Sequence, residues 1–137
     1  MILVLDTSSE NVFFGLWDEE SGAWSSKDEF LGGRELNSLI IKKLDKLFWY
    51  SQENKNKLVG IIIAAGPGSF TGLRIGMSVA NTLAYTLDIP IVTVKGETSP
   101  EKLLKSGQIM LKSVGQQYEA PAVPFYGAEP HISQPRH

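Results

Sequence analysis

One stretch of the chain, "GIIIAAGPGSFTGLRIGMSVANTLAYTL", constrains the fold more than any other. An apolar run without alternation enters a turn that contains three glycines, and a pattern with helical spacing leaves it. Uninterrupted apolar strands are typical of a sheet that is covered on both faces. We therefore expect an α/β fold, with a helix from Phe70 to Leu87 whose N-cap is Ser69 or Thr71.

Other apolar runs extend this prediction. The segments "ILVLDTS", "NVFFGLWDE" and "GAWSSKDEF" are separated by short polar turns, which favours an antiparallel meander of three strands. An apolar stripe with helical spacing predicts a helix near 35–50, and "DIPIVTV" predicts a fifth strand. The order predicts a mixed sheet with helices packed against it. We place this unit at 1–96, and residues 97–137 as a short helix, with Ser99 as its cap, followed by an extended tail.

Composition excludes several function classes. The chain has 137 residues, a formal net charge of −2 and no cysteine, so disulfides and thiolate metal sites are excluded. The small charge gives no long-range attraction to nucleic acid or anionic membranes. No apolar run is long enough to span a bilayer and the start lacks signal-peptide features, so we expect a cytoplasmic protein. His131 and His137 lack metallopeptidase spacing, and we expect no metal site.

The glycine loop has two interpretations. A strand, a glycine turn and a helix N-terminus together attract anions, but a phosphate-binding P-loop needs a lysine followed by serine or threonine, where this chain has Leu73 and Arg74. The spacing therefore favours a tight turn with close helix packing over phosphate binding. Asp6 would hold magnesium-bound phosphates or, as we favour, cap a turn. The candidate nucleotide-binding residues are Asp6, Thr7, Ser8, Gly66, Gly68 and Ser69.

Small residues recur every four positions along the predicted second helix and form one flat ridge. This ridge packs either on the sheet or against a partner helix. Its members are Gly72, Gly76, Ala80 and Ala84. Arg74 would bind an anion or pair with a carboxylate. The aromatic run at 48–50 is either core packing or a partner patch.

"MILVLDTSS" together with "GPGSFTGLRIGMSVANTLAY" resembles the TsaB (YeaZ) family of tRNA threonylcarbamoyladenosine synthesis. The resemblance covers about 1–94 and returns loosely at "APAVPFYGAEPHI". It implies a ribonuclease H-like unit of the actin-like, Hsp70-like ATPase superfold, with three antiparallel and two parallel strands. Family members have a second domain after the fifth strand, so we expect an internal loss here.

The resemblance also implies a function. The family is a non-catalytic relative of TsaD, which transfers threonylcarbamoyl to N6 of adenosine 37 in tRNA, so we expect a scaffold that binds and activates a TsaD-like transferase. A TsaE-like P-loop ATPase and a homodimer are further expected partners, tRNA is reached only through the complex, and ATP with Mg²⁺ is expected only at the partner interface. The expected interface residues are Phe70, Thr71, Arg74, Met77, Ser78 and Asn81, followed by Leu36, Leu39, Ile40 and Lys43. The alternative is a small actin-like nucleotide-binding phosphotransferase or ATPase that uses Asp6 and the glycine loop.

Overall fold

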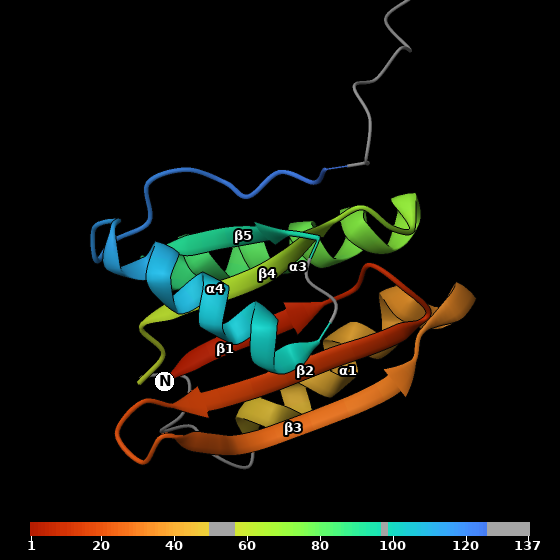
Figure 1. The fold of residues 1–137 in the computed structure, drawn as a ribbon. Helices are drawn as coiled ribbons and strands as arrows, with labels where there is room; N and C mark the ends of the chain where they lie inside the picture. Colours follow the sequence, from red (N-terminus) through yellow and green to blue (C-terminus); the bar gives the residue numbers. More distant parts are fainter. Residues whose placement is uncertain (50–56, 97–98, 126–137) are drawn as a thin grey trace, which may run out of the picture.

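A computed structural model describes residues 1–49, 57–96 and 99–125 of the chain. Its centre is a five-stranded sheet in the order β3-β2-β1-β4-β5 (Figure 1). The first three strands pair antiparallel, whereas β4 pairs parallel with both β1 and β5. The strands are β1 Ile2–Asp6, β2 Asn11–Asp18, β3 Ala23–Leu31, β4 Gly60–Gly66 and β5 Ile91–Lys95. The predicted mixed sheet, with three antiparallel and two parallel strands, is confirmed.

Helices cover both faces of this sheet, so the molecule has three layers (Figure 1). The helix α1 and the longer α3 lie on one face, and α4 lies on the other. A 3-10 turn, η1, leads into α1. Their bounds are η1 Gly33–Glu35, α1 Leu36–Trp49, α3 Phe70–Leu87 and α4 Pro100–Lys112. Among the described helices, none is long and apolar enough to cross a membrane.

The central strands are covered on both faces, which explains why apolar and polar residues do not alternate along them. In β1, Leu3 and Leu5 belong to the core beneath α1 and α3, whereas Ile2 and Val4 belong to the core beneath α4. Successive side chains of a strand point to opposite faces, so a strand covered on both sides needs apolar residues at every position. All residues of β4 are buried for the same reason.

The helix predicted after residue 97 is confirmed as α4 and extends to Lys112. The side chain of Ser99 accepts a hydrogen bond from the backbone N–H of Lys102 at 3.2 Å, and Pro100 opens the helix. Gly107 lies so close to Ile62 of β4 that a β-carbon at this position would overlap the isoleucine side chain. A glycine is therefore needed for α4 to approach the sheet this closely.

Candidate functional site

The glycine loop lies at the carboxyl end of β4, beside the end of β1. The backbone N–H of Ser69 donates to the carbonyl oxygen of Ser8 at 2.8 Å. The hydroxyl of Thr7, which is fully buried, donates to the carbonyl oxygen of Gly72 at 2.8 Å. The end of β1 is thus held directly against the first turn of α3. The cap of that helix is Ser69, whose hydroxyl accepts from Gly72 N–H at 3.1 Å, which decides between the two predicted caps.

This close approach explains the glycines of the loop. A β-carbon at Gly68 would overlap the carbonyl oxygen of Ser8, and one at Gly72 would overlap the carbonyl oxygen of Thr7. A β-carbon at Gly76 would overlap the side chain of Thr7. The interpretation that these glycines permit a tight turn and close helix packing is therefore confirmed.

Asp6 forms a turn within its own segment. Its Oδ1 atom accepts a hydrogen bond from the backbone N–H of Ser8 at 2.9 Å and another from the Ser8 hydroxyl at 2.6 Å. An aspartate that bonds the backbone two residues later is the usual Asx turn, which is the arrangement favoured from the sequence. In the described part of the chain, no group of three or more His, Asp or Glu side chains is placed to hold a metal ion.

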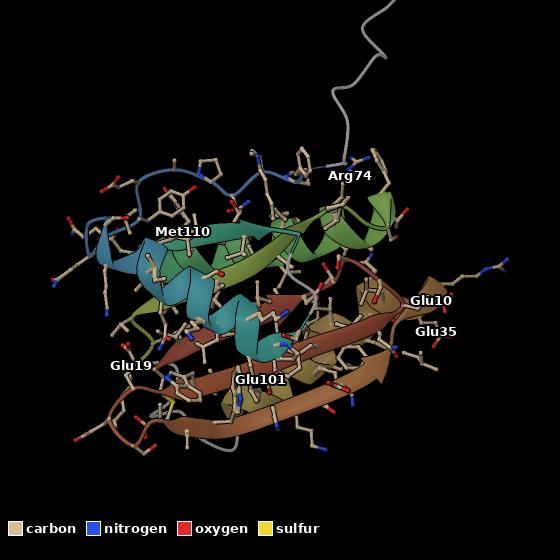
Figure 2. The ribbon with its side chains drawn as sticks, in the orientation of Figure 1. Glu10, Glu19, Glu35, Arg74, Glu101 and Met110 are labelled. Carbon is tan, nitrogen blue, oxygen red and sulfur yellow. The ribbon has the colours of Figure 1, made fainter. Side chains whose placement is uncertain are left out.

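A hollow of about 330 Å³ borders the glycine loop. Figure 2 shows Glu10 and Glu35 at this end of the sheet and Glu19 at the other end. Because its lining includes an acidic residue, Glu10, as well as a basic one, Arg34, the hollow does not have the purely basic lining of a simple anion site. Its lining residues are Ser9, Glu10, Gly33, Arg34, Leu36, Ser69, Thr71 and Gly72.

The small-residue ridge of α3 faces the sheet. Ala80 and Ala84 have no exposed surface and belong to the core that includes Leu3 and Ile61. The hypothesis that this ridge meets a partner helix is therefore wrong, and its alternative of packing on the sheet is right. Gly76→Leu and Ala80→Arg are each expected to unfold the chain, because they place a large side chain where α3 packs on the sheet.

The outward face of α3 forms a groove with α1. Phe70 is 55% exposed, and the Arg74 guanidinium lies over its ring at 5.2 Å from the centroid. Several of the residues expected at a partner interface gather here, in a hollow of about 320 Å³. The lining residues are Asn37, Phe70, Thr71, Arg74, Ile75, Ser78 and Val79, and we call this the α1–α3 groove.

Three expected interface residues lie elsewhere. Leu36, Ile40 and Met77 are buried in the monomer core, where a partner does not reach them. Their assignment to a partner surface is therefore corrected, for the physical reason that the apolar stripe of each helix packs on the sheet.

The other expected interface residues have contacts within the chain. Leu39 is half-buried. Lys43 pairs with Asp28 of β3, its Nζ lying 3.0 Å from Oδ2. Asn81 is half-buried and bonds to the backbone of Ala122.

Some exposed residues were not predicted from periodicity. Ile41 on α1 is 55% exposed and Tyr85 near the end of α3 is 72% exposed. An apolar side chain off the core stripe was the available signal for each. The side chains of the aromatic run at 48–50, together with His131 and His137, lie outside the described residues.

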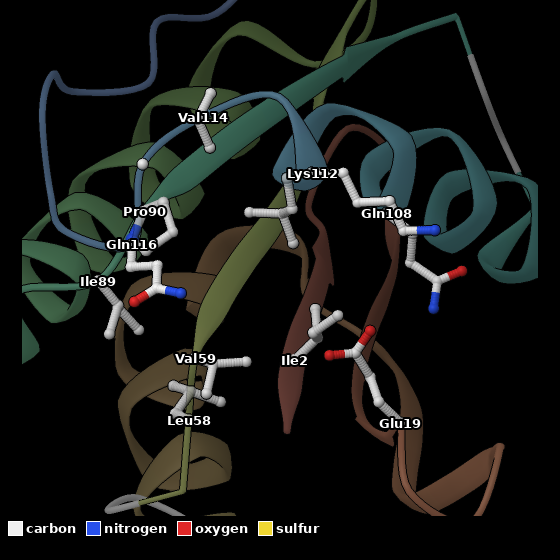
Figure 3. A pocket seen from close by; sticks show the side chains of 12 residues that line it. Ile2, Glu19, Leu58, Val59, Ile89, Pro90, Gln108, Lys112, Val114 and Gln116 are labelled. Atoms are coloured by element: carbon white, nitrogen blue, oxygen red, sulfur yellow. The ribbon is translucent and has the colours of Figure 1, made fainter.

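Another hollow lies at the opposite end of the sheet from the glycine loop, and Figure 3 shows side chains that line it. It has a volume of about 520 Å³ and is bounded by Ile2, Val59, Leu111, Glu19 and Lys112, among others. None of the predicted site residues lines this hollow, so it is separate from the candidate site.

Comparisons with known proteins agree with this architecture. The family model described as TsaD, tRNA N6-adenosine threonylcarbamoyltransferase, matches residues 31–98. The tRNA threonylcarbamoyladenosine biosynthesis protein TsaB of Bacillus subtilis is 52% identical over 48 residues, which are 35% of this chain and 20% of that protein. TsaB of Haemophilus influenzae is 31% identical over 98 residues, covering 72% of this chain and 40% of the relative.

A solved structure, YeaZ from Pseudomonas aeruginosa, superposes with a TM-score of 0.61 at 28% identity, over 69% of this chain and 43% of that one. The strand order, the two-sided helical cover and these matches define a ribonuclease H-like unit of the actin-like ATPase superfold. The chain belongs to the TsaB (YeaZ) family of tRNA threonylcarbamoyladenosine biosynthesis. Its matched segments span 20–40% of the length of these two curated relatives.

Proposed function

We propose that this chain is a non-catalytic scaffold that binds and activates a TsaD-like transferase during formation of N6-threonylcarbamoyladenosine at position 37 of tRNA. One observation carries the proposal. The α1–α3 groove gathers Phe70, Thr71, Arg74 and Ser78 on the outer side of two helices, away from the sheet. Exposed aromatic and arginine side chains are the residue types that most often anchor protein–protein interfaces.

The non-catalytic role is supported by what fills the glycine loop. Two backbone N–H groups that such a loop would offer to a phosphate already have acceptors within the chain, since Ser69 donates to the carbonyl oxygen of Ser8 and Gly72 donates to the hydroxyl of Ser69. The described residues also provide no cluster of metal ligands. The chain's own residues therefore do not fit a complete ATP–Mg²⁺ site, and in this proposal nucleotide binds only where the partner supplies further groups. A TsaE-like P-loop ATPase is a further partner in this proposal.

Affinity measurements on exposed variants test the proposal. We expect the chain to form a one-to-one complex with the TsaD-like transferase of the same genome in isothermal titration calorimetry. Phe70→Asp removes an exposed apolar anchor and is expected to weaken this complex at least about tenfold, or about 1.4 kcal/mol. The matched control is Ile109→Asp, since Ile109 is 66% exposed on α4 at the opposite face of the sheet.

Two results would redirect the interpretation. Equal weakening by both variants would place the partner elsewhere or indicate general damage to the fold. Hydrolysis of ATP by the chain alone, lost in Asp6→Asn, would favour the alternative of a small actin-like phosphotransferase or ATPase.

A further inference from the structure

The segment 117–125, which we call the strap, follows α4 past the β5 edge of the sheet and lies along α3 (Figure 1). Its middle is held by Asn81 of α3. The Asn81 amide donates to the carbonyl oxygen of Ala122 at 2.9 Å and accepts from the Ala122 N–H at 2.7 Å. The Asn81 side chain thus donates to and accepts from the backbone of the same residue. A residue on a neighbouring antiparallel strand makes the same pair of hydrogen bonds to an extended segment.

The two ends of the strap are also anchored. At the end of α3, Asp88 accepts hydrogen bonds from the Tyr118 N–H at 3.2 Å and from the Gln117 amide at 3.0 Å. The Tyr118 ring packs edge-on against Tyr85, with centroids 5.6 Å apart. At the other end, the Phe125 N–H donates to Ala65 of β4 at 2.7 Å. The strap therefore follows α3 from its last turn to the glycine loop.

The angular positions of residues around α3 show which of its side chains remain exposed between α1 and the strap. With 100° per residue, the exposed residues Arg74, Ser78 and Tyr85 lie within about 40° of one another on the outward face. Asn81 lies about 20° to one side of them, toward the strap. Residues on the other side, Ile75 among them, line the α1–α3 groove. The outward stripe of α3 is thus flanked by α1 on one side and by the strap on the other.

The area of the two helices alone is small for a stable interface. At 1.5 Å per residue and a width of about 10 Å, the 18 residues of α3 and the 14 of α1 have a footprint of about 480 Å². A standard interface takes roughly 800 Å² from each partner. The strap is about 30 Å long at 3.3 Å per residue, and a width of 5–10 Å adds about 150–300 Å².

The strap presents apolar surface on its outer side. Ala122, which Asn81 holds, is 8% exposed and faces the core, whereas its neighbour Val123 is 67% exposed. The alternation of an extended segment explains this difference between neighbours. Val123 lies on the strap and the exposed Tyr85 packs against Tyr118 of the strap, so both add apolar surface beside the outward stripe of α3.

We propose that the strap is the third element of the partner-binding surface, so that a TsaD-like transferase contacts α1, the outward stripe of α3 and the strap together. This inference rests on the proposed function, because the occupant is the same transferase. The strap's role is to widen the surface on the side of α3 where the sheet ends at β5. Asn81 is a positioning residue that acts on the partner through the strap.

Titration calorimetry with the TsaD-like transferase tests this with matched valine variants. Val123→Asp is expected to weaken the complex at least about fivefold. The control, Val59→Asp, changes a residue that is 53% exposed at the amino end of β4, and is expected to change affinity less than about twofold. Asn81→Ala is expected to weaken the complex while increasing hydrogen exchange at the Ala122 amide, because that N–H loses its acceptor.

The outcomes separate this inference from the proposed function. If Phe70→Asp weakens the complex and Val123→Asp does not, the strap inference fails and the proposed function stands. Tighter binding by Asn81→Ala would show that the strap competes with the partner, which also overturns the inference. If the wild-type chain forms no complex with the transferase, the proposed function fails and the strap inference fails with it.

Discussion

Substitution of Gly76 by alanine tests the contact between β1 and α3 that organises the glycine loop. A methyl group at this position would overlap Thr7, which is fully buried and donates a hydrogen bond to the Gly72 carbonyl at 2.8 Å. Thr7 therefore has to move, and its buried hydrogen bond is then lengthened or lost. On helix propensity alone, the same change would stabilise α3 by about 1 kcal/mol.

The two destabilising effects of Gly76→Ala together exceed its gain in helix propensity. Overpacking of a filled core costs about 1–3 kcal/mol. A buried hydrogen bond that loses one partner costs about 1–3 kcal/mol more. After subtraction of the propensity gain of about 1 kcal/mol, Gly76→Ala is expected to lower the free energy of unfolding by about 1–5 kcal/mol.

Urea denaturation, followed by far-ultraviolet circular dichroism, measures this change. The double variant Thr7→Ala, Gly76→Ala provides the control, because alanine at position 7 removes the hydroxyl and methyl groups that the new methyl would overlap. We expect the double variant to show a coupling energy of at least about 1 kcal/mol that partly restores stability. A Gly76→Ala protein as stable as the wild type, or a coupling energy near zero, would refute the reasoning.

Other variants test single contacts by the same denaturation assay or by hydrogen exchange. Ser69→Ala removes the N-cap of α3 and is expected to cost about 1 kcal/mol, whereas no measurable change would mean that another group caps the helix. Asn81→Ala is expected to raise the exchange rate of the Ala122 amide without unfolding the sheet, and unchanged exchange would contradict the hydrogen bond between Asn81 and Ala122. Lys43→Ala is expected to cost less than about 1 kcal/mol, since its ion pair with Asp28 is partly exposed, and a larger loss would point to a structural role.

The secondary structure was predictable wherever its signals are local. The apolar runs of β1 and β4, and the cap Ser99 and proline at the start of α4, each lie in or next to the element that they specify. The antiparallel pairing of the first three strands also follows from their short connections, and a parallel setting for β4 follows from its apolar run without alternation. For these features, neighbouring residues and elementary packing rules are sufficient.

The side of each helix that remains exposed was harder to predict. The flat ridge of α3 satisfied the requirements of a sheet contact and of a helix–helix contact, and the position of Thr7 beside Gly76 and the burial of Ala80 distinguish them. That contact joins residues far apart in the chain. The residues predicted for a partner interface therefore included core residues such as Ile40 and Met77, besides four that line the α1–α3 groove.

The strap was not predictable because its contacts have no sequence period. The Asn81 side chain bonds to the backbone of Ala122, which every residue type except proline could offer. The side chain at position 122 therefore does not predict this contact. Tyr118 packs against Tyr85 across a large separation along the chain. The proline-rich composition of the tail indicated an extended segment but did not indicate which helix it follows.

Quantification of threonylcarbamoyladenosine in tRNA tests the central claim most directly. The gene is deleted in its own genome, complemented with the wild type, Phe70→Asp or Ile109→Asp, and the modified nucleoside is measured by mass spectrometry. We predict that deletion lowers the modification, that the wild type and Ile109→Asp restore it, and that Phe70→Asp does not. An unchanged nucleoside level in the deletion strain, or full restoration by Phe70→Asp, would contradict the account.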